Sequence, residues 1–103
     1  MRIPTHPSSE FTVTERDIAD FRRDGAVCLR GVFAGWVDTI AAGIERNLAE
    51  PGPYAAQSVR SGEAGSFFDD YCNWQRVAEF RDVVERSPAA VVAARIMQSQ
   101  TAQ

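Results

Sequence analysis

The stretch from 14 to 33, TERDIADFRRDGAVCLRGVF, sets the order of the first elements of the chain. Thr14 followed three residues later by Asp17 is typical of a helix N-cap with its capping box. Gly25 suits the left-handed backbone that ends a helix, because glycine has no Cβ to oppose it. The pattern therefore predicts a helix between Thr14 and Gly25. Its inner face would carry Ile18 and Phe21.

The period of the apolar residues changes directly after this helix. Val27 and Leu29 alternate with Cys28 and Arg30, which predicts a short strand over Ala26–Arg30. After Gly31 the apolar residues recur every three or four positions, so a second helix with one apolar face should follow and end before Pro51. That face would consist of Phe33, Val37, Ile40, Ile44 and Leu48.

The second half of the chain begins with a stretch rich in Pro, Gly and Ser. Residues Pro51–Ser66 show no sustained period and predict a long surface loop. An aromatic cluster follows in a segment too irregular to predict as a strand, and we expect its side chains to pack in the core rather than to line a pocket. The cluster consists of Phe67, Phe68, Tyr71 and Trp74.

Two further helices are expected after the aromatic cluster. One should run from about Gln75 to Arg86, with Asn73 as its cap and with Val77, Phe80 and Val84 buried. The other should be capped by Ser87 and run from Pro88 to about Met97, because proline fits the first helical turn. Residues 1–10 read as a flexible lead-in, and residues 11–103 read as one domain or part of one.

Composition excludes several classes of function. The 103 residues contain 45% hydrophobic residues, contain no apolar run long enough to span a bilayer and begin without a signal-peptide core, so we expect a soluble, cytoplasmic protein. The net charge is −3, and the eleven positive charges are scattered arginines, which disfavours nucleic acid and membrane as partners. A chain without lysine can form neither a Schiff base nor a P-loop.

Residues able to carry chemistry are few. His6 is the single histidine and cannot complete a zinc or iron site alone. Asp69 and Asp70 should point to opposite faces of an extended segment, which favours solvated or capping roles over paired acid–base work. Cys28 and Cys72 lack an activating histidine nearby and read as ordinary, reduced, structural thiols. We therefore assign no catalytic, cofactor-binding or metal-binding residue.

The order helix, glycine, strand, helix in DIADFRRDGAVCLRGVFAGWVDTIAAGIERNLAE resembles the opening of phytanoyl-CoA dioxygenase family proteins. Those openings pair an F-x-x-x-G step, here Phe21 to Gly25, with a V-x-L-R-G-V-like strand, here Val27 to Val32. The later part is similar too, because FFDDYCNW precedes two consecutive helices, QRVAEFRDVVERS and SPAAVVAARIM. The resemblance covers Phe11 to Gln103.

This resemblance implies a mainly helical α+β fragment that covers a double-stranded β-helix, the jelly-roll or cupin-like barrel of non-haem Fe(II) and 2-oxoglutarate oxygenases. Complete family members hydroxylate small organic or acyl substrates, and hold iron with an H-x-D pair plus a distant His while an Arg or similar group anchors 2-oxoglutarate. None of these residues can be placed in this chain. We therefore expect the N-terminal part of such a domain, with most of the barrel missing, inactive alone and without a cofactor of its own.

A different reading is a complete, small α+β interaction module without catalytic activity. Its single predicted strand would leave backbone groups unpaired and would need a partner. The expected partner is either the missing barrel portion or a second copy, bound through the exposed strand and the apolar helix faces. The sequence alone leaves open whether the chain belongs to an enzyme.

Overall fold

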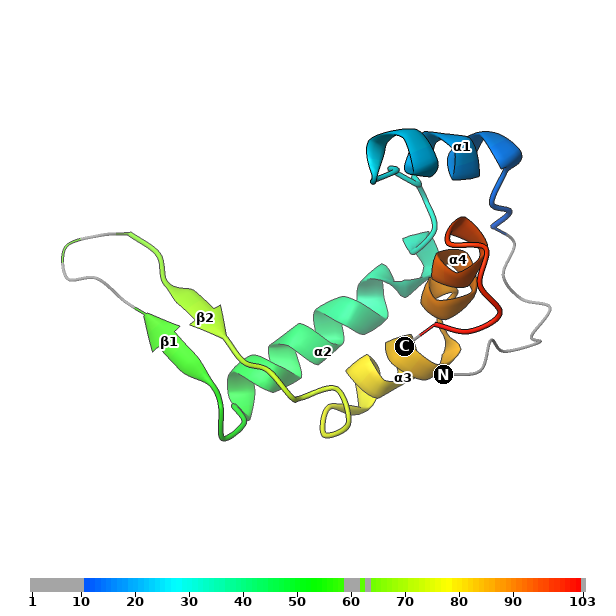
Figure 1. The fold of residues 1–103 in the computed structure, drawn as a ribbon. Coiled ribbons are helices and arrows are strands. Elements are labelled where there is room, and N and C mark those ends of the chain that lie inside the picture. The colour runs from blue at the N-terminus through cyan, green and yellow to red at the C-terminus, as the bar shows by residue number, and fades with distance from the viewer. Residues whose placement is uncertain (1–10, 59–61, 63, 103) are drawn as a thin grey trace.

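The computed structural model describes residues 11–58, 62 and 64–102 (Figure 1). The chain is a mainly helical α+β fold, as predicted, and it contains one antiparallel hairpin that was not predicted. The lead-in 1–10 lies outside the described residues. In order, the elements are α1 (Glu15–Asp24), a 3₁₀ turn η1 (Ala34–Trp36), α2 (Val37–Ala49), β1 (Ala56–Ser58), β2 (Phe67–Asp69), α3 (Ala78–Arg86) and α4 (Ala89–Ile96).

Helix α1 begins and ends where its sequence predicts. The Asp17 N–H donates to Thr14 Oγ1 over 3.1 Å, and the Thr14 N–H donates back to the Asp17 carboxylate over 2.9 Å. Gly25 adopts a φ of 74°, and its N–H donates to the Phe21 carbonyl over 2.7 Å. Both ends of the helix are thus satisfied by groups within a few residues.

The strand predicted over Ala26–Arg30 is wrong for the part of the chain that the structure describes. Residues 26–29 are extended but pair with no described strand, and Arg30 already begins a turn. The alternation itself is real, because Val27 and Leu29 are half-buried while Cys28 and Arg30 are exposed. Alternation fixes which side chains share a face, whereas a β-ladder also needs a second strand.

A hairpin occupies the region that was predicted as a loop followed by an irregular segment. Strand β1 lies inside the predicted loop Pro51–Ser66 and pairs antiparallel with β2, so that Ala56 faces Asp69 and Ser58 faces Phe67. At the base of the hairpin the rings of Tyr54 and Tyr71 stack, with centroids 5.1 Å apart. This aromatic pair compensates for the weak strand propensity of the β1 sequence Ala-Gln-Ser.

Core packing of the aromatic cluster, as the sequence predicted, is wrong for most of its members. Phe67 is 66% exposed, Tyr71 is 59% exposed and Trp74 is 38% exposed, while Phe68 is half-buried. Figure 1 shows the reason: the hairpin projects from the far end of α2, where no other helix covers it. The aromatic residues therefore lie on a surface.

Helices α2 and α3 pack closely at a glycine. Gly43 is buried, and a Cβ placed on it would lie 2.6 Å from Cε1 of Phe80. Beside this contact the Arg46 guanidinium donates to both carboxylate oxygens of Glu79, at 2.7 to 3.0 Å. The absence of a side chain at Gly43 thus lets the Phe80 ring lie against the α2 backbone.

The beginning of α3 differs from the prediction. The helix starts at Ala78 rather than Gln75, and Val77 occupies the N-cap position. Asn73 does not cap the helix; its carbonyl accepts the N–H groups of Arg76 and Val77 in a preceding turn. Val77 is fully buried as predicted, whereas Phe80 and Val84 are half-buried.

The core is small and lies around α4. Helix α4 begins at Ala89, with Pro88 rather than the predicted Ser87 at its N-cap position; Ser87 Oγ accepts the Ala89 N–H over 3.3 Å from one residue earlier. The Cα radius of gyration is 16.7 Å, whereas a compact domain of about 100 residues has a radius near 13 Å. The molecule is therefore elongated, with its buried apolar side chains at one place. These are Val77, Ala90, Val91, Ala94 and Ile96.

We predict that Gly43→Ala lowers the unfolding free energy by about 1–3 kcal/mol, because the added methyl group must displace Phe80 or separate α2 from α3. Gly35→Ala is the matched control, since a Cβ there has no atom within 4 Å. Urea denaturation of both variants measures the difference. Equal stability of the two variants would contradict the close α2–α3 contact.

Acid should weaken the same contact. The hydrogen bonds from Arg46 lower the pKa of the Glu79 carboxyl below its ordinary value of 4.5. The contribution of this group to stability is therefore complete above pH 4.5 and is lost as the pH falls through the lowered pKa. Arg46→Gln should lower the unfolding free energy at neutral pH, and its difference from the wild type should shrink on acidification.

Arg95→Gln removes the same charge from a residue that pairs with no carboxylate among the described residues. Its difference from the wild type should not follow that pH course. Urea titrations of the three proteins over a pH series provide the measurement.

Candidate interaction sites

The residues singled out for chemistry do not converge in the structure. His6 lies outside the described residues. Asp69 is exposed while the Asp70 side chain is fully buried, so the two carboxylates face different surroundings as expected, but a solvated or capping role is wrong for Asp70, which pairs with Arg76. Cys28 and Cys72 are free thiols, in line with the expectation of ordinary reduced cysteines, and both are exposed.

The chain does not fit the iron site that the family resemblance implies. A facial triad takes two histidines and one carboxylate, whereas the whole sequence contains one histidine. Within residues 11–58, 62 and 64–102, no three His, Cys, Asp or Glu side chains come together in a group that could hold a metal ion.

A polar cluster ties the hairpin to the helices. Asp70 Oδ2 accepts the Gly52 N–H over 3.0 Å and an Arg76 N–H over 3.2 Å. Arg76 also donates to Asn47 Oδ1 over 2.9 Å and to the Glu50 carbonyl over 2.8 Å. One guanidinium thus joins the end of α2 to the residue that follows β2. Asp70 Oδ1 is buried and has no hydrogen-bond partner within the described structure.

Helix α2 carries an apolar stripe that its neighbours do not cover. Val37, Ile44 and Leu48 are 59%, 48% and 49% exposed, and Phe33 just before the helix is 38% exposed. At 3.6 residues per turn this stripe lies about a third of a turn from Gly43, where α3 packs. The apolar side chains predicted for one face of this helix do lie on one face. Helix α3, however, packs against the adjacent face.

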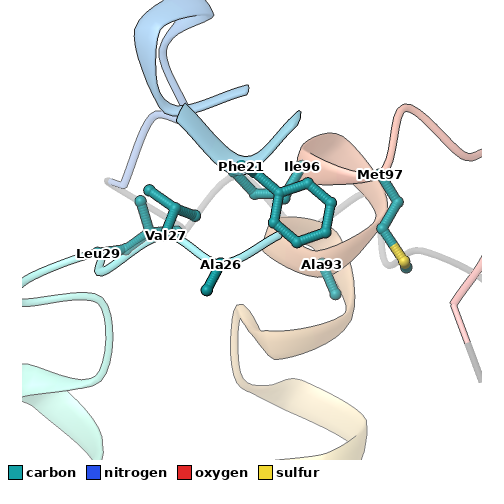
Figure 2. Close-up of a pocket in the computed structure, with 7 residues that line it drawn as sticks. All are labelled: Phe21, Ala26, Val27, Leu29, Ala93, Ile96 and Met97. Atoms are coloured by element: carbon teal, nitrogen blue, oxygen red, sulfur yellow. The ribbon is translucent and has the colours of Figure 1, made fainter. Parts of the chain in front are cut away.

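An open apolar groove lies at the other end of the molecule, between α1, the extended segment 26–29 and the end of α4 (Figure 2). Its volume is about 360 Å³, and its surface is almost wholly apolar. Val27 and Leu29 enter it from the extended segment, and the ring of Phe21 enters it from α1. The complete lining is Phe21, Ala26, Val27, Leu29, Ala93, Ile96 and Met97.

Sequence reasoning did not predict this groove. The period-two pattern correctly placed Val27 and Leu29 on one side of their segment, but nothing in the local sequence places α4 beside them. The link is long-range: the Arg22 guanidinium donates to the Gln98 side-chain carbonyl, which joins α1 to the end of α4. Such a contact between residues far apart in the chain leaves no local signal.

Comparison of the chain with protein-family models, with curated proteins and with solved structures finds no match. None of the described helices is long and apolar enough to cross a bilayer. The structure offers three surface features that could bind a partner or ligand: the stripe on α2, the hairpin and the groove.

The polar cluster around Arg76 should control the mobility of the hairpin. We predict that Asp70→Ala makes the backbone amides of β1 and β2 exchange with solvent roughly tenfold faster, because the hairpin loses its ion pair and its bond to Gly52. The amides of α3 and α4 should keep their rates. Asp69→Ala, at the exposed neighbouring carboxylate, is the control. Hydrogen-exchange mass spectrometry in dilute solution gives the answer, and equal hairpin rates in both variants would contradict the role of Asp70.

Proposed function

We propose that this chain is the helical cover of a phytanoyl-CoA dioxygenase-like oxygenase domain, and that its own residues bind the barrel of that domain rather than iron or substrate. In such a protein the iron and 2-oxoglutarate would be held by residues other than these. The chain would contribute a docking surface. The observation that carries this proposal is the uncovered apolar stripe of α2.

The stripe is too regular to be a scatter of exposed apolar residues. Four apolar side chains recur at helical spacing along α2 and the turn before it, while Asp38 and Glu45 lie on another side of the helix. Single exposed apolar residues are normal, but an aligned row of them marks a contact surface. The row consists of Phe33, Val37, Ile44 and Leu48.

The energy available from this surface is adequate for docking. Complete burial of a large aliphatic or aromatic side chain is worth about 1.5–3 kcal/mol, so covering four that are roughly half exposed would contribute on the order of 4 kcal/mol. That is a large fraction of the stability of a typical domain. A folded body resting on α2 would therefore stabilise both parts.

The order of the elements supports the same proposal. A capped helix, a left-handed glycine, an extended segment and a long helix follow one another as they do in the family opening. The extended segment 26–29 has no ladder partner among the described residues. This is the arrangement expected if the sheet to which it belongs is provided by another part of an oxygenase domain.

We predict that replacing Val37, Ile44 and Leu48 together by Ser lowers the binding of a hydrophobic dye such as ANS, while the apolar groove and the hairpin aromatics retain some binding. The unfolding free energy should change by less than about 1 kcal/mol per site, since these side chains are already exposed. A matched control replaces the exposed Ala41, Ala42 and Ala49 of the same helix by Ser. Equal dye binding by both triple variants would show that the α2 stripe is not a surface that binds the dye.

The family assignment has its own test. We expect the DNA that follows the Gln103 codon, read in every frame, to encode an H-x-D pair and a later His. The chain itself, incubated with Fe(II), 2-oxoglutarate and oxygen, should produce no succinate. Stoichiometric iron binding with turnover would contradict the proposed role as a cover.

An interaction module without catalytic activity is the second candidate. The exposed aromatic residues of the hairpin favour it, because the hairpin projects beyond the end of α2 (Figure 1) and offers a second surface for a partner. Absence of any H-x-D and later His in the downstream DNA would favour this candidate over the cover.

A further inference from the structure

The hairpin presents two different faces to its surroundings. Phe67 and Asp69 lie on one face of β2, because they are two residues apart, and Phe68 between them lies on the other. Phe67 and Asp69 are exposed, whereas Phe68 is half-buried. The alternation continues past the strand, since the Asp70 side chain is fully buried and Tyr71 is 59% exposed. We call the side that carries Phe67, Asp69 and Tyr71 the outer face of the hairpin.

The outer face is open beside β2. Ala56 lies opposite Asp69 on β1, and its methyl group is too short to cover the carboxylate. Tyr54 stacks on Tyr71, so one side of the Tyr71 ring is covered and the other side faces away from Tyr54. A carboxylate and an aromatic ring surface are therefore accessible two residues apart on the same face.

The free edge of β2 lies next to these side chains. Strand β2 pairs with β1 on one side and with no other strand among the described residues. Figure 1 shows the hairpin projecting beyond the end of α2. An edge strand presents unpaired N–H and C=O groups, with which an extended peptide can pair by adding a further strand. Main-chain hydrogen bonds then provide affinity, and alternate side chains provide specificity.

The charge of the outer face selects the side chain that such a strand should carry. Asp69 pairs with no cation in the part of the chain that the structure describes. A residue directly opposite Asp69 on an added strand would have its Cβ about 5 Å away, within reach of an ion pair. Arginine fits best, because its planar guanidinium can pair with a carboxylate and stack on an aromatic ring such as Tyr71. The residues two positions before and after this arginine would lie against Phe67 and Tyr71, so they should be apolar.

We propose that the free edge of β2 binds an extended segment of another protein, in which an arginine lies opposite Asp69 and is flanked by apolar residues at alternate positions. The contact is small. Phe67 is 66% and Tyr71 is 59% exposed, so at about 200 Å² per aromatic side chain the two offer roughly 250 Å². With a matching area from the partner this is below the range of stable interfaces, so the contact belongs to the weak and transient class.

The test uses a short peptide with blocked ends, Val-Thr-Arg-Thr-Val, and the same peptide with citrulline in place of arginine as its neutral control. Binding is followed by the backbone amide signals of the protein in NMR spectra. The arginine peptide should shift the signals of 67–71 saturably and leave those of α1 and α4 in place. The citrulline peptide should bind about fivefold more weakly, because it keeps the strand and the apolar side chains but loses the charge.

Variants of the protein separate the contribution of the charge from that of the ring. Asp69→Asn should weaken binding of the arginine peptide about fivefold, and Tyr71→Leu should weaken it about twofold to fivefold. Asp69→Arg should prefer the peptide Val-Thr-Glu-Thr-Val, because the opposite-charge pair is restored with its signs exchanged. Glu45→Gln removes an exposed carboxylate from α2 and is the matched control, whose affinity should equal that of the wild type. Circular dichroism of each variant checks that the helices remain folded.

The proposal would be overturned by the absence of a saturable shift at millimolar arginine peptide, by equal affinity for the arginine and citrulline peptides, or by shifts located outside the hairpin. Shifts of the same signals when the protein alone is concentrated would make a second copy the occupant, which also overturns it. The site does not depend on the proposed docking of α2. The variant with Val37, Ile44 and Leu48 replaced by Ser should therefore bind the arginine peptide as the wild type does.

Discussion

The close approach of α2 and α3 at Gly43 is the contact on which the rest of the structure depends. It lets the Phe80 ring lie on the α2 backbone, and it places Arg46 within reach of Glu79. It also brings the end of α2 beside the turn before α3, so that Arg76 can join Asn47 to Asp70. The hairpin and the small core around α4 are both positioned from this pair of helices.

The pairing of these two helices uses only part of the apolar surface that α2 offers. A helix in a compact domain normally buries its whole apolar face, because burial of that face provides most of its stability. Here Gly43 and Asn47 are buried while the stripe through Ile44 remains in solvent. The molecule is elongated and its hairpin exposed for the same reason: no described helix packs on the α2 stripe or on the hairpin.

Local sequence was sufficient to predict that the helices exist and to place most of their ends, but not the start of α3, and it was insufficient for the strands. The capping box at Thr14, the glycine after α1 and the position of α4 could be predicted, because the groups that fix them lie within four residues of one another. The hairpin, and the lack of strand pairing at segment 26–29, could not be predicted, because a strand is defined by a partner elsewhere in the chain. The groove depends on α4 packing beside α1 and was missed for the same reason.

The exposed aromatic residues show a second limit of local reasoning. Phe67, Tyr71 and Trp74 have the composition of a core, and only the projection of the hairpin away from the helices reveals them as a surface. Composition shows that a segment has apolar side chains. The arrangement of the helices and strands decides whether those side chains are buried within this chain.

Buried and exposed positions that are neighbours on α2 are therefore under different evolutionary constraints. Gly43 and Asn47 are held by the folding of this chain, so they should resist substitution in any descendant that still folds. Val37, Ile44 and Leu48 contribute little to the folding of this chain, because they remain largely exposed. If no other surface covers them, these three positions would drift toward polar residues while Gly43, next to Ile44, stayed unchanged.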